Sequence, residues 1–305
     1  MKYYMFRLSF PYGVHFGDGN LDSSNMTFHA DTLFSALYIE AVKSGEQVAQ
    51  QLLENTKKGN VVLSDAFPYI GDTYYLPKPL VYIQRNEDVG NSVLKKKAKK
   101  LNYVPVDKME EYLQGELDVK KEGDKFASLG SGQVKVSVAI KGLEDTEPYY
   151  VGTYSYAEDN GLYFFAGLEE EFEDVFLDLL DMLSFSGIGG KRSSGYGRFE
   201  VMKMVPVPQE RFATTSSDKG YMLLSSSLPK AEEMARALEN AEYLVEKRSG
   251  FVQSQSFLAA RKKSEQYFLK AGSRFMHPFE GDIYEVSVGG EHPVYRYGKA
   301  MFWAL

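Results

Sequence analysis

The chain has 305 residues, of which 44% are hydrophobic and 14% aromatic, so it can bury a sizeable core and should form about two domains. It contains no cysteine, which excludes disulfides, thiolate metal sites and cysteine nucleophiles. The formal net charge of -7 argues against a general nucleic-acid binder. No stretch approaches the roughly 20 apolar residues of a membrane span, and Arg7 interrupts the apolar run at the start, so we expect a soluble, cytoplasmic protein without a signal peptide.

Charge is unevenly distributed along the chain. Residues 85–141 hold 12 basic and 9 acidic side chains, 187–203 hold 4 and 1, and 242–275 hold 7 and 3, which leaves an excess of negative charge elsewhere. This division suits a basic surface for a polyanion and an acidic surface that docks a protein. Charge also varies along any solvated chain, so the pattern alone leaves both interpretations open.

The chain opens with a predicted strand and helix. Residues 2–10 alternate in polarity and are rich in aromatic side chains, which favours a strand, and a polar loop follows. The segment 30–45 predicts a helix that Asp31 or Thr32 caps and Gly45 ends.

The composition changes between Gln84 and Gly132. Two short strands are expected before this stretch, near 61–64 and 73–76. Within it apolar residues are few, and KKKAKK at 95–100 places five lysines in six positions. Such a sequence predicts an inserted, partly mobile lobe.

Alternation returns after this lobe. Residues 133–140 predict a strand with one solvated face, and further strands are expected at 149–156 and 162–166, joined by a turn whose Asn-Gly dipeptide favours a hairpin. The segment 169–187 has the clearest helical periodicity in the chain, and three glutamates stand at the positive end of its dipole.

A glycine-rich loop follows this predicted helix directly. GIGGKRSSGYGRFE, residues 187–200, holds five glycines, three basic residues and two serines. It fits neither the dinucleotide motif nor the P-loop, because both run from a strand into a helix, whereas this loop leaves a helix and enters a strand. Glycine amides beside Lys191 and Arg192 suit the phosphates of an extended strand. The alternative is a flexible connection with solvated cations.

After residue 206 the order of elements starts again. A strand is expected at 221–228, a helix at 229–241 and a strand at 243–249, and three further strand candidates follow at 267–272, 283–288 and 294–303. This repetition predicts an α+β chain of two similar units with a boundary at 205 or 206.

No metal site or carboxylate pair stands out, and no histidine has metal-ligand spacing to another. His15, in the loop after the first strand, could remove a 2′-hydroxyl proton in metal-independent RNA cleavage. Beside Phe16, a loop histidine more often stacks or forms a hydrogen bond. Near the C-terminus, Arg248 and Phe251 could place a guanidinium and a ring against RNA.

Four stretches together resemble a known family. FRLSFPYGVHFGDG, FHADTLFSAL, GIGGKRSSGYGRF and EHPVYRYGKA are similar to the RAMP superfamily of CRISPR proteins and, more narrowly, to the fourth subunit of the type III-A Csm effector complex. The likeness runs from end to end and is least distinctive in the lobe. It implies two ferredoxin-like, RRM-related domains at 1–205 and 206–305, the first with an insertion at about 85–148.

The resemblance also implies a function. Such subunits are non-catalytic RNA binders that hold the 5′ handle of the CRISPR RNA (crRNA), contact the large polymerase-like Cas subunit and the first backbone RAMP subunit, and reach target RNA indirectly. They project a β-hairpin thumb, which corresponds to residues 133–154 here. No cofactor is implied.

The expected RNA contacts are backbone amides, cations, hydroxyls and stacking groups, and they fall mainly on the glycine loop. Their residues are His15, Phe16, Lys135, Lys141, Gly189, Gly190, Lys191, Arg192, Ser193, Ser194, Tyr196 and Arg248. Two alternatives stay open: a metal-independent CRISPR RNA endoribonuclease that uses His15, and a scaffold in which the glycine loop meets protein alone.

Overall fold

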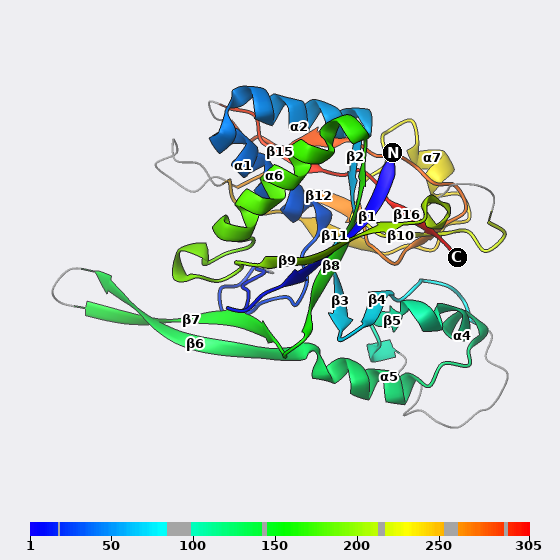
Figure 1. Ribbon diagram of the computed structural model, residues 1–305, viewed down its shortest axis with the longest axis horizontal. Coiled ribbons are helices and arrows are strands. Elements are labelled where there is room, and N and C mark those ends of the chain that lie inside the picture. Colours follow the sequence, from blue (N-terminus) through cyan, green and yellow to red (C-terminus); the bar gives the residue numbers. More distant parts are fainter. Residues whose placement is uncertain (18, 84–98, 142–144, 213–216, 253–261, 290–291) are drawn as a thin grey trace.

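The computed structural model describes residues 1–17, 19–83, 99–141, 145–212, 217–252, 262–289 and 292–305. A seven-stranded antiparallel sheet organises the first two thirds of the chain, in the order β5-β4-β3-β8-β1-β9, with β2 also paired to β8 (Figure 1). Its strands are β1 (Lys2–Ser9), β2 (Val61–Leu63), β3 (Phe67–Ile70), β4 (Thr73–Pro77), β5 (Tyr103–Pro105), β8 (Asn160–Leu168) and β9 (Glu200–Val207).

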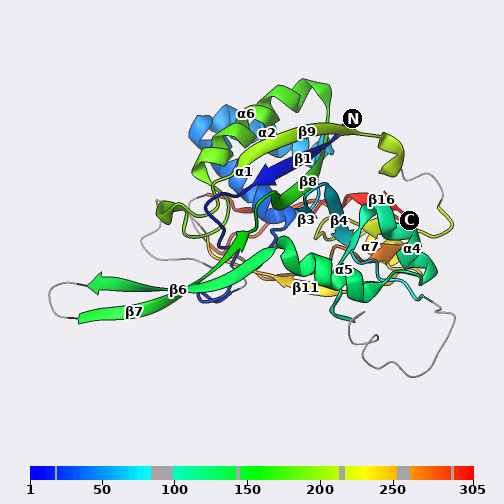
Figure 2. The same cartoon turned by 60° about the horizontal axis from the view of Figure 1, so that its bottom comes forward.

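Three helices cover one face of this sheet: α1 (Ala30–Ser44), α2 (Glu46–Lys58) and α6 (Glu170–Ser186) (Figure 2). Phe6 of β1 and Phe164 of β8 point to this face and pack against Phe176 of α6. The neighbouring residues of β8, Tyr163 and Phe165, point the opposite way into a second core. Successive side chains of a strand alternate between faces, and β8 is buried on both, which makes it the centre of the fold.

The strands and helices of the first half follow the order β-α-β-β-α-β. These places are taken in turn by β1, α1, β3, β8, α6 and β9. In the sheet the order is β3-β8-β1-β9, so β1 lies between β8 and β9. The predicted strand at 2–10 and the predicted helices at 30–45 and 169–187 are confirmed, whereas α2 and β3 had no predicted counterpart.

The described part of the lobe has regular secondary structure. After β5 it forms α4 (Met109–Gln114) and α5 (Val119–Phe126), with single 3-10 turns at Val106–Lys108 and Ala127–Leu129. Several of its few apolar side chains turn inward against the sheet: Leu101, Val104, Met109, Tyr112, Leu117 and Val119 are buried. Met109 and Tyr112 lie on one side of α4, Val119 begins α5, and the other three lie in or beside β5 and between the helices, so sparse apolar residues suffice. Most of the KKKAKK run lies outside the described residues.

β6 (Gly130–Lys141) and β7 (Asp145–Tyr156) form the expected hairpin, which projects from the body (Figure 1). The prediction of one solvated face is wrong. Val134, Val136 and Val138 are each more than half exposed. Because this part of the hairpin stands clear of the body, both of its faces meet solvent.

The predicted hairpin turn between 149–156 and 162–166 is also wrong. β7 pairs with β6, while β8 pairs with β1, β2 and β3, so the turn redirects the chain from one sheet to another. Asp159, and not the Asn-Gly pair, takes the left-handed conformation there, with φ 60°.

The described residues of the second half form three small sheets. β10 (Tyr221–Leu223) lies between β13 (Arg274–Phe275) and β16 (Phe302–Ala304), and two further pairs are β11 (Val245–Arg248) with β12 (Gln266–Leu269) and β14 (Ile283–Glu285) with β15 (Tyr295–Tyr297). The helix expected at 229–241 shrinks to α7 (Met234–Ala237). The Glu233 carboxylate accepts hydrogen bonds from the N–H groups of Lys230, Glu280 and Gly281, which holds this segment in turns.

The expected pair of ferredoxin-like domains is not confirmed, because the second half lacks a second helix-covered sheet among its described residues. β9 continues to Val207 and pairs there with Tyr3, and a 3-10 turn at Gln209–Arg211 follows. The division into 1–205 and 206–305 stays a prediction. Within the described ranges, no helix has the length and apolar character to cross a membrane.

Candidate nucleic-acid interface

Three segments that are distant in sequence meet beyond the end of β1. The loop formed by residues 11–17 and 19–25 lies between the base of the β6–β7 hairpin and the part of the glycine loop that precedes β9, residues 187–199. Gly197 donates its N–H to the Gly13 carbonyl at 2.9 Å, and Gly152 of β7 donates to the Leu21 carbonyl at 2.8 Å. Val14 and Tyr154 exchange both backbone hydrogen bonds. The glycine loop is therefore fixed to the hairpin through the N-terminal loop.

The glycines of the loop permit close backbone approach. Gly197 has φ +77°, and a Cβ there would lie 2.0 Å from the Ile188 carbonyl oxygen. A Cβ at Gly190 would lie 2.6 Å from the His15 ring. These positions tolerate only glycine because no side chain fits between the crossing segments. Close packing of the loop against Ile188 therefore requires glycine at position 197.

His15 and Phe16 lie behind the glycine loop, with only 6% and 4% of their surface exposed. The Nδ1 of His15 donates a hydrogen bond to the Gly152 carbonyl at 2.6 Å, and its own carbonyl accepts one from the Gly190 N–H. Phe16 packs edge-on against Phe10 and Phe28. Both residues support the loop from inside, and the Gly190 amide expected to bind RNA is already bonded. Their RNA contact is untested.

Cations and rings from two segments face each other where the glycine loop meets the hairpin. The Lys135 Nζ of β6 lies 5.2 Å from the centroid of the Tyr196 ring, and the Lys191 Nζ lies 4.7 Å from the centroid of the Tyr149 ring. The structure thus brings together three predicted residues and adds Tyr149. A ring holds a cation by its negative face without removing it from solvent. This set of four residues is called the cation–tyrosine cluster below.

The remaining residues of the glycine loop form one exposed turn. Lys191 has φ 55° and starts a 3-10 turn at Arg192–Ser194, in which the two serines are exposed. Arg192 Nη1 lies 3.5 Å from the Gly187 carbonyl oxygen, a long contact. Lys141 ends β6 opposite Asp145, and its side chain lies outside the described residues.

Arg248, the last residue of β11, lies away from the glycine loop and beside the start of α1. Its Nε and Nη2 donate to the two carboxylate oxygens of Asp31, at 3.0 and 2.5 Å. Burial alone would raise the pKa of the Asp31 carboxyl, but Arg248, His29 and Arg296 lower it to about 2. The prediction that Asp31 or Thr32 caps α1 is wrong, since His29 is the N-cap residue and it is the Asp65 carboxylate that accepts the Ala30 N–H. An RNA contact by Arg248 stays untested.

These buried charges join the two halves of the chain. Asp65, which follows β2, also accepts the N–H of Ser226 in the second half, and its other oxygen lies 2.8 Å from His29 Nδ1. Glu246 of β11 lies 3.5 Å from the same nitrogen. We call Asp31, Arg248, Arg296, His29 and Asp65 the seam cluster.

We expect His29 to make stability depend on pH. Burial would lower its pKa, but Asp65 and Glu246 more than compensate, so the pKa is raised above the ordinary 6.5. Its stabilising contribution is full below about pH 6.5 and is lost as the pH rises through the folded-state value. Urea midpoints measured from pH 5 to 9 should fall across this window in the wild type and less in His29→Gln. An equal fall in both proteins would contradict this, and the exposed His292→Gln serves as control.

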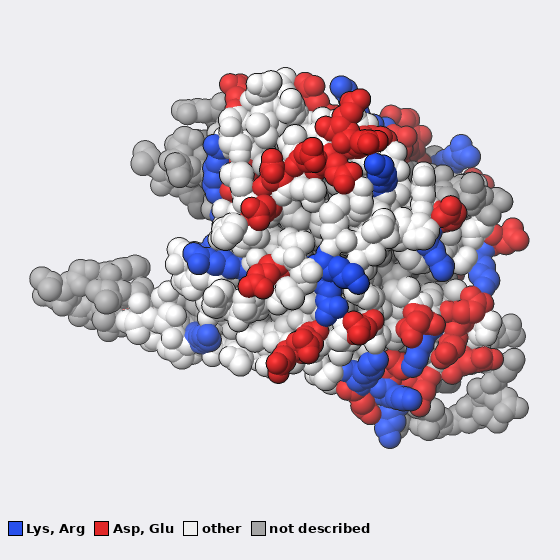
Figure 3. Space-filling model, viewed as in Figure 1, with Lys and Arg blue, Asp and Glu red and all other residues white. Residues whose placement is uncertain are grey.

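Charge is segregated on the surface (Figure 3). Acidic side chains form a band along α6, which carries six acidic and no basic residues, and basic side chains lie beyond its end, where the glycine loop follows. Among the described residues, no group of three or more histidine, aspartate or glutamate side chains could hold a metal ion. The surface around the cation–tyrosine cluster therefore offers charge and stacking to a ligand.

Comparisons with known families match both halves of the chain. Residues 8–200 match the model of the RAMP superfamily, and residues 216–305 match that of the CRISPR Csm4 C-terminal domain. A curated protein of Mycobacterium tuberculosis (strain CDC 1551 / Oshkosh), CRISPR system Cms protein Csm4, is 38% identical over 99% of this chain and 97% of its own length. The protein of that name in Streptococcus thermophilus is 33% identical over 100% and 99%.

Solved structures share the fold. A chain of the Csm3-Csm4 subcomplex in the type III-A CRISPR-Cas interference complex superposes with a TM-score of 0.68 at 20% identity, covering 100% of this chain and 99% of that one. A chain of the Csm1-Csm4 cassette in complex with cA4 gives 0.57 at 18% identity, covering 100% and 98%. With family models on both halves and full-length relatives above 30% identity, the chain belongs to the RAMP superfamily and, within it, to the Csm4 proteins of CRISPR systems.

Proposed function

We propose that the chain is a non-catalytic RNA-binding subunit of a type III-A Csm interference complex in antiviral defence, and that its glycine loop holds the 5′ handle of the crRNA. The observation that carries this is the cation–tyrosine cluster, in which Lys135 and Lys191 lie over Tyr196 and Tyr149 where two segments meet. Cations beside partly exposed rings suit a single strand, because phosphate and base can be bound together.

Each part of the interface has a distinct role in this proposal. The ammonium groups of Lys135 and Lys191, with Arg192, neutralise successive phosphates, and the hydroxyls of Ser193 and Ser194 donate to phosphate oxygens. Tyr196 and Tyr149 stack against bases. His15 and Phe16 keep the loop in place from behind, since their side chains are buried.

The partners follow from the similar structures. Csm4 chains occur there with Csm3 and with Csm1, so we propose that this chain links the large polymerase-like subunit to the first backbone subunit in the cytoplasm. Target RNA would be reached indirectly, through the hairpin. The acidic band along α6 suits protein contacts and repels stray RNA.

The alternative of a nuclease that uses His15 finds no support. A general base must reach the proton that it removes, whereas His15 is buried and its Nδ1 is bonded to the Gly152 carbonyl. Repeat RNA incubated with the chain in EDTA should stay intact. Cleavage that disappears in His15→Ala would overturn the proposal of a non-catalytic subunit.

The main test replaces the two adjacent cations of the loop. We expect Lys191→Ala/Arg192→Ala, co-expressed with the neighbouring effector genes and a CRISPR array, to retain about tenfold less guide RNA than the wild type, because two phosphate contacts are lost. Sequencing of the co-purified RNA should show guides with one shared repeat-derived 5′ end only in the wild type.

The matched control is Lys120→Ala/Lys121→Ala, which removes two exposed adjacent lysines from α5. It should retain guides like the wild type. If both double variants retained as much guide RNA as the wild type, the loop would serve protein contact or packing. If both lost guide RNA equally, the effect would come from the change in net charge.

A further inference from the structure

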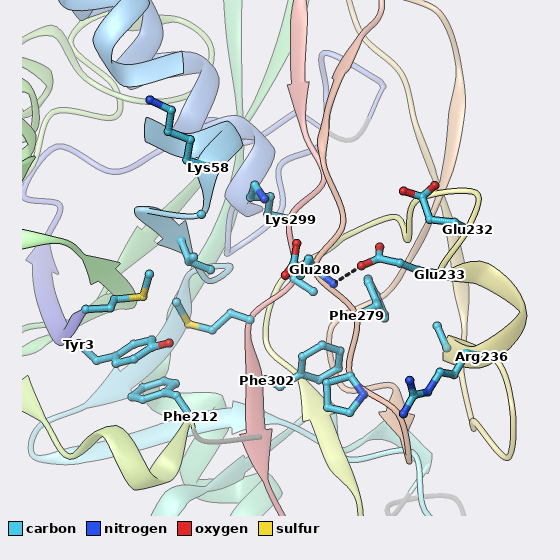
Figure 4. Close-up of a pocket in the computed structure, with 17 residues that line it drawn as sticks. Tyr3, Lys58, Phe212, Glu232, Glu233, Arg236, Phe279, Glu280, Lys299 and Phe302 are labelled. Atoms are coloured by element: carbon cyan, nitrogen blue, oxygen red, sulfur yellow. Dashed lines mark hydrogen bonds between the residues drawn. The ribbon is translucent and has the colours of Figure 1, made fainter. Parts of the chain in front are cut away.

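A cavity of about 750 Å³ opens near the start of β1, at the end of that strand away from the glycine loop. It lies between the end of α2, the turns around α7, and β16 (Figure 4). No part of the proposed RNA interface lines it. One of its lining residues, Lys299, belongs to the terminal EHPVYRYGKA stretch, whose role the RNA interface leaves unexplained.

Lys299 is the unusual member of this cavity. Only 4% of its surface is exposed, and within the described part of the chain its Nζ has no hydrogen bond or ion pair. Burial lowers the pKa of its ammonium, which Asp282 and Glu280 offset only in part. Lys299 lines the cavity, so an anion placed there would supply the acceptor that the described protein atoms do not.

Two of the neighbouring carboxylates, those of Glu233 and Glu280, are already bonded. Glu233 accepts three backbone N–H groups, one of which is the dashed contact to Glu280 in Figure 4. The Glu280 carboxylate lies 3.1 Å from the Nζ of Lys230, outside the cavity lining. Lys299 therefore lies beside acidic groups that are bonded to other residues.

Aromatic rings form the walls of the cavity. Tyr3 and Phe212 are stacked with centroids 4.3 Å apart, and Phe279 and Phe302 meet edge to face at 5.3 Å. These flat apolar surfaces suit an aliphatic or aromatic side chain beside the anion. The site therefore combines one buried cation with apolar walls.

We propose that this cavity is a docking site for a partner protein segment that inserts one carboxylate against Lys299 and an apolar side chain against the rings. The partner is a protein and not a nucleic acid because the lining mixes three carboxylates, Glu232, Glu233 and Glu280, with three cations, Lys58, Arg236 and Lys299, which suits a segment that carries both signs of charge better than a chain of phosphates. A segment with a single buried carboxylate, and basic residues towards the acidic rim, is complementary in charge. This inference rests on the proposed function, since it assigns a surface of that subunit to a protein partner.

The test uses the full-length chain and overlapping 15-residue peptides that cover the co-expressed effector subunits. We expect one peptide with an aspartate or glutamate to bind, and to bind at least tenfold more weakly when that residue becomes the amide or when the chain carries Lys299→Met. The control variant Lys120→Met, on exposed α5, should bind like the wild type. Free acetyl-glutamate should not displace the peptide at equal concentration, since it lacks the apolar contact.

Folding and RNA retention separate this proposal from its alternatives. Lys299→Met keeps the length of the side chain and removes an unpaired buried charge, so its melting temperature should equal or exceed that of the wild type. A melting temperature of Lys299→Met below that of the wild type would overturn the docking proposal, and so would the absence of any bound peptide. It would also be overturned if peptide binding changed neither with the amide peptide nor with Lys299→Met, or if a 12-nucleotide RNA bound in a way that depends on Lys299. The complex that carries Lys299→Met should retain guide RNA like the wild type. A failure of the docking proposal can then be distinguished from a failure of the proposed RNA binding by the glycine loop.

Discussion

Replacing Gly197 with alanine should destabilise the chain by about 3 kcal/mol, the sum of positive-φ strain and forced displacement of a packed neighbour. Gly197 has φ +77°, and the new Cβ would lie 2.0 Å from the Ile188 carbonyl oxygen. That carbonyl belongs to backbone, which cannot turn aside like a side chain. The loop would have to break its backbone hydrogen bonds to Ile188 and Gly13, and the loss of the bond to Gly13 would detach it from the base of the hairpin.

Gly195 supplies the matched control, because it has a similar φ of +89° but a Cβ at this position would meet no atom within 4 Å. Gly195→Ala should therefore cost only about 1 kcal/mol, from backbone strain alone. Urea unfolding followed by the fluorescence of Trp303, the single tryptophan, measures both variants. Equal losses at the two positions would show that the close approach at Gly197 has no energetic weight.

Asp31→Ala should be the most destabilising change in the seam cluster, at about 4 kcal/mol, because it leaves a buried cation without its counter-charge. Arg248 donates two hydrogen bonds to that carboxylate, and Arg296 Nε lies 3.9 Å away. Asp31→Leu/Arg248→Met removes both charges of the pair and should recover much of the loss. Urea midpoints of the three proteins decide this, and a double variant no better than the single one would contradict it.

The Asp31 carboxylate also makes the stability of the chain fall at low pH. Its pKa of about 2 lies below the ordinary 3.8, so its contribution to stability is complete above about pH 4 and is lost as the pH falls through 2. Between pH 4 and 2, the urea midpoint of the wild type should fall more steeply than that of the double variant. Parallel curves would assign acid unfolding to other carboxylates.

Periodicity predicted the elements whose pattern is local. α1 and α6 carry apolar residues at helical spacing, and β1 alternates, so each could be recognised without its neighbours. The helix expected at 229–241 failed because the bonds that Glu233 makes to Glu280 and Gly281 come from a distant part of the chain. The predicted burial of the hairpin valines failed for a related reason, since alternation along a strand predicts an apolar face but does not show whether another part of the chain covers it.

The candidate site was predicted in part. Composition marked the glycine loop and Lys191, and the structure sets Lys135 and Tyr196 beside them. Tyr149 was missed, although the register could have found it: Lys135 faces Val151 across the hairpin, and Tyr149 is two residues from Val151 on the same face. The seam cluster was not predictable, because Asp31 reads locally as a cap and its partner Arg248 lies 217 residues away.

β1 lies between β8 and β9 and is hydrogen-bonded along both edges, with the cavity of Lys299 at its start and the glycine loop beyond its end. Eight residues of strand span about 26 Å. Because β1 is hydrogen-bonded to a strand on each side, its length is fixed, and it sets the distance between the proposed RNA interface and the proposed docking cavity. An insertion of one residue would exchange its helix-facing and lobe-facing side chains, so we expect changes of chain length to be tolerated in the loops and not within β1.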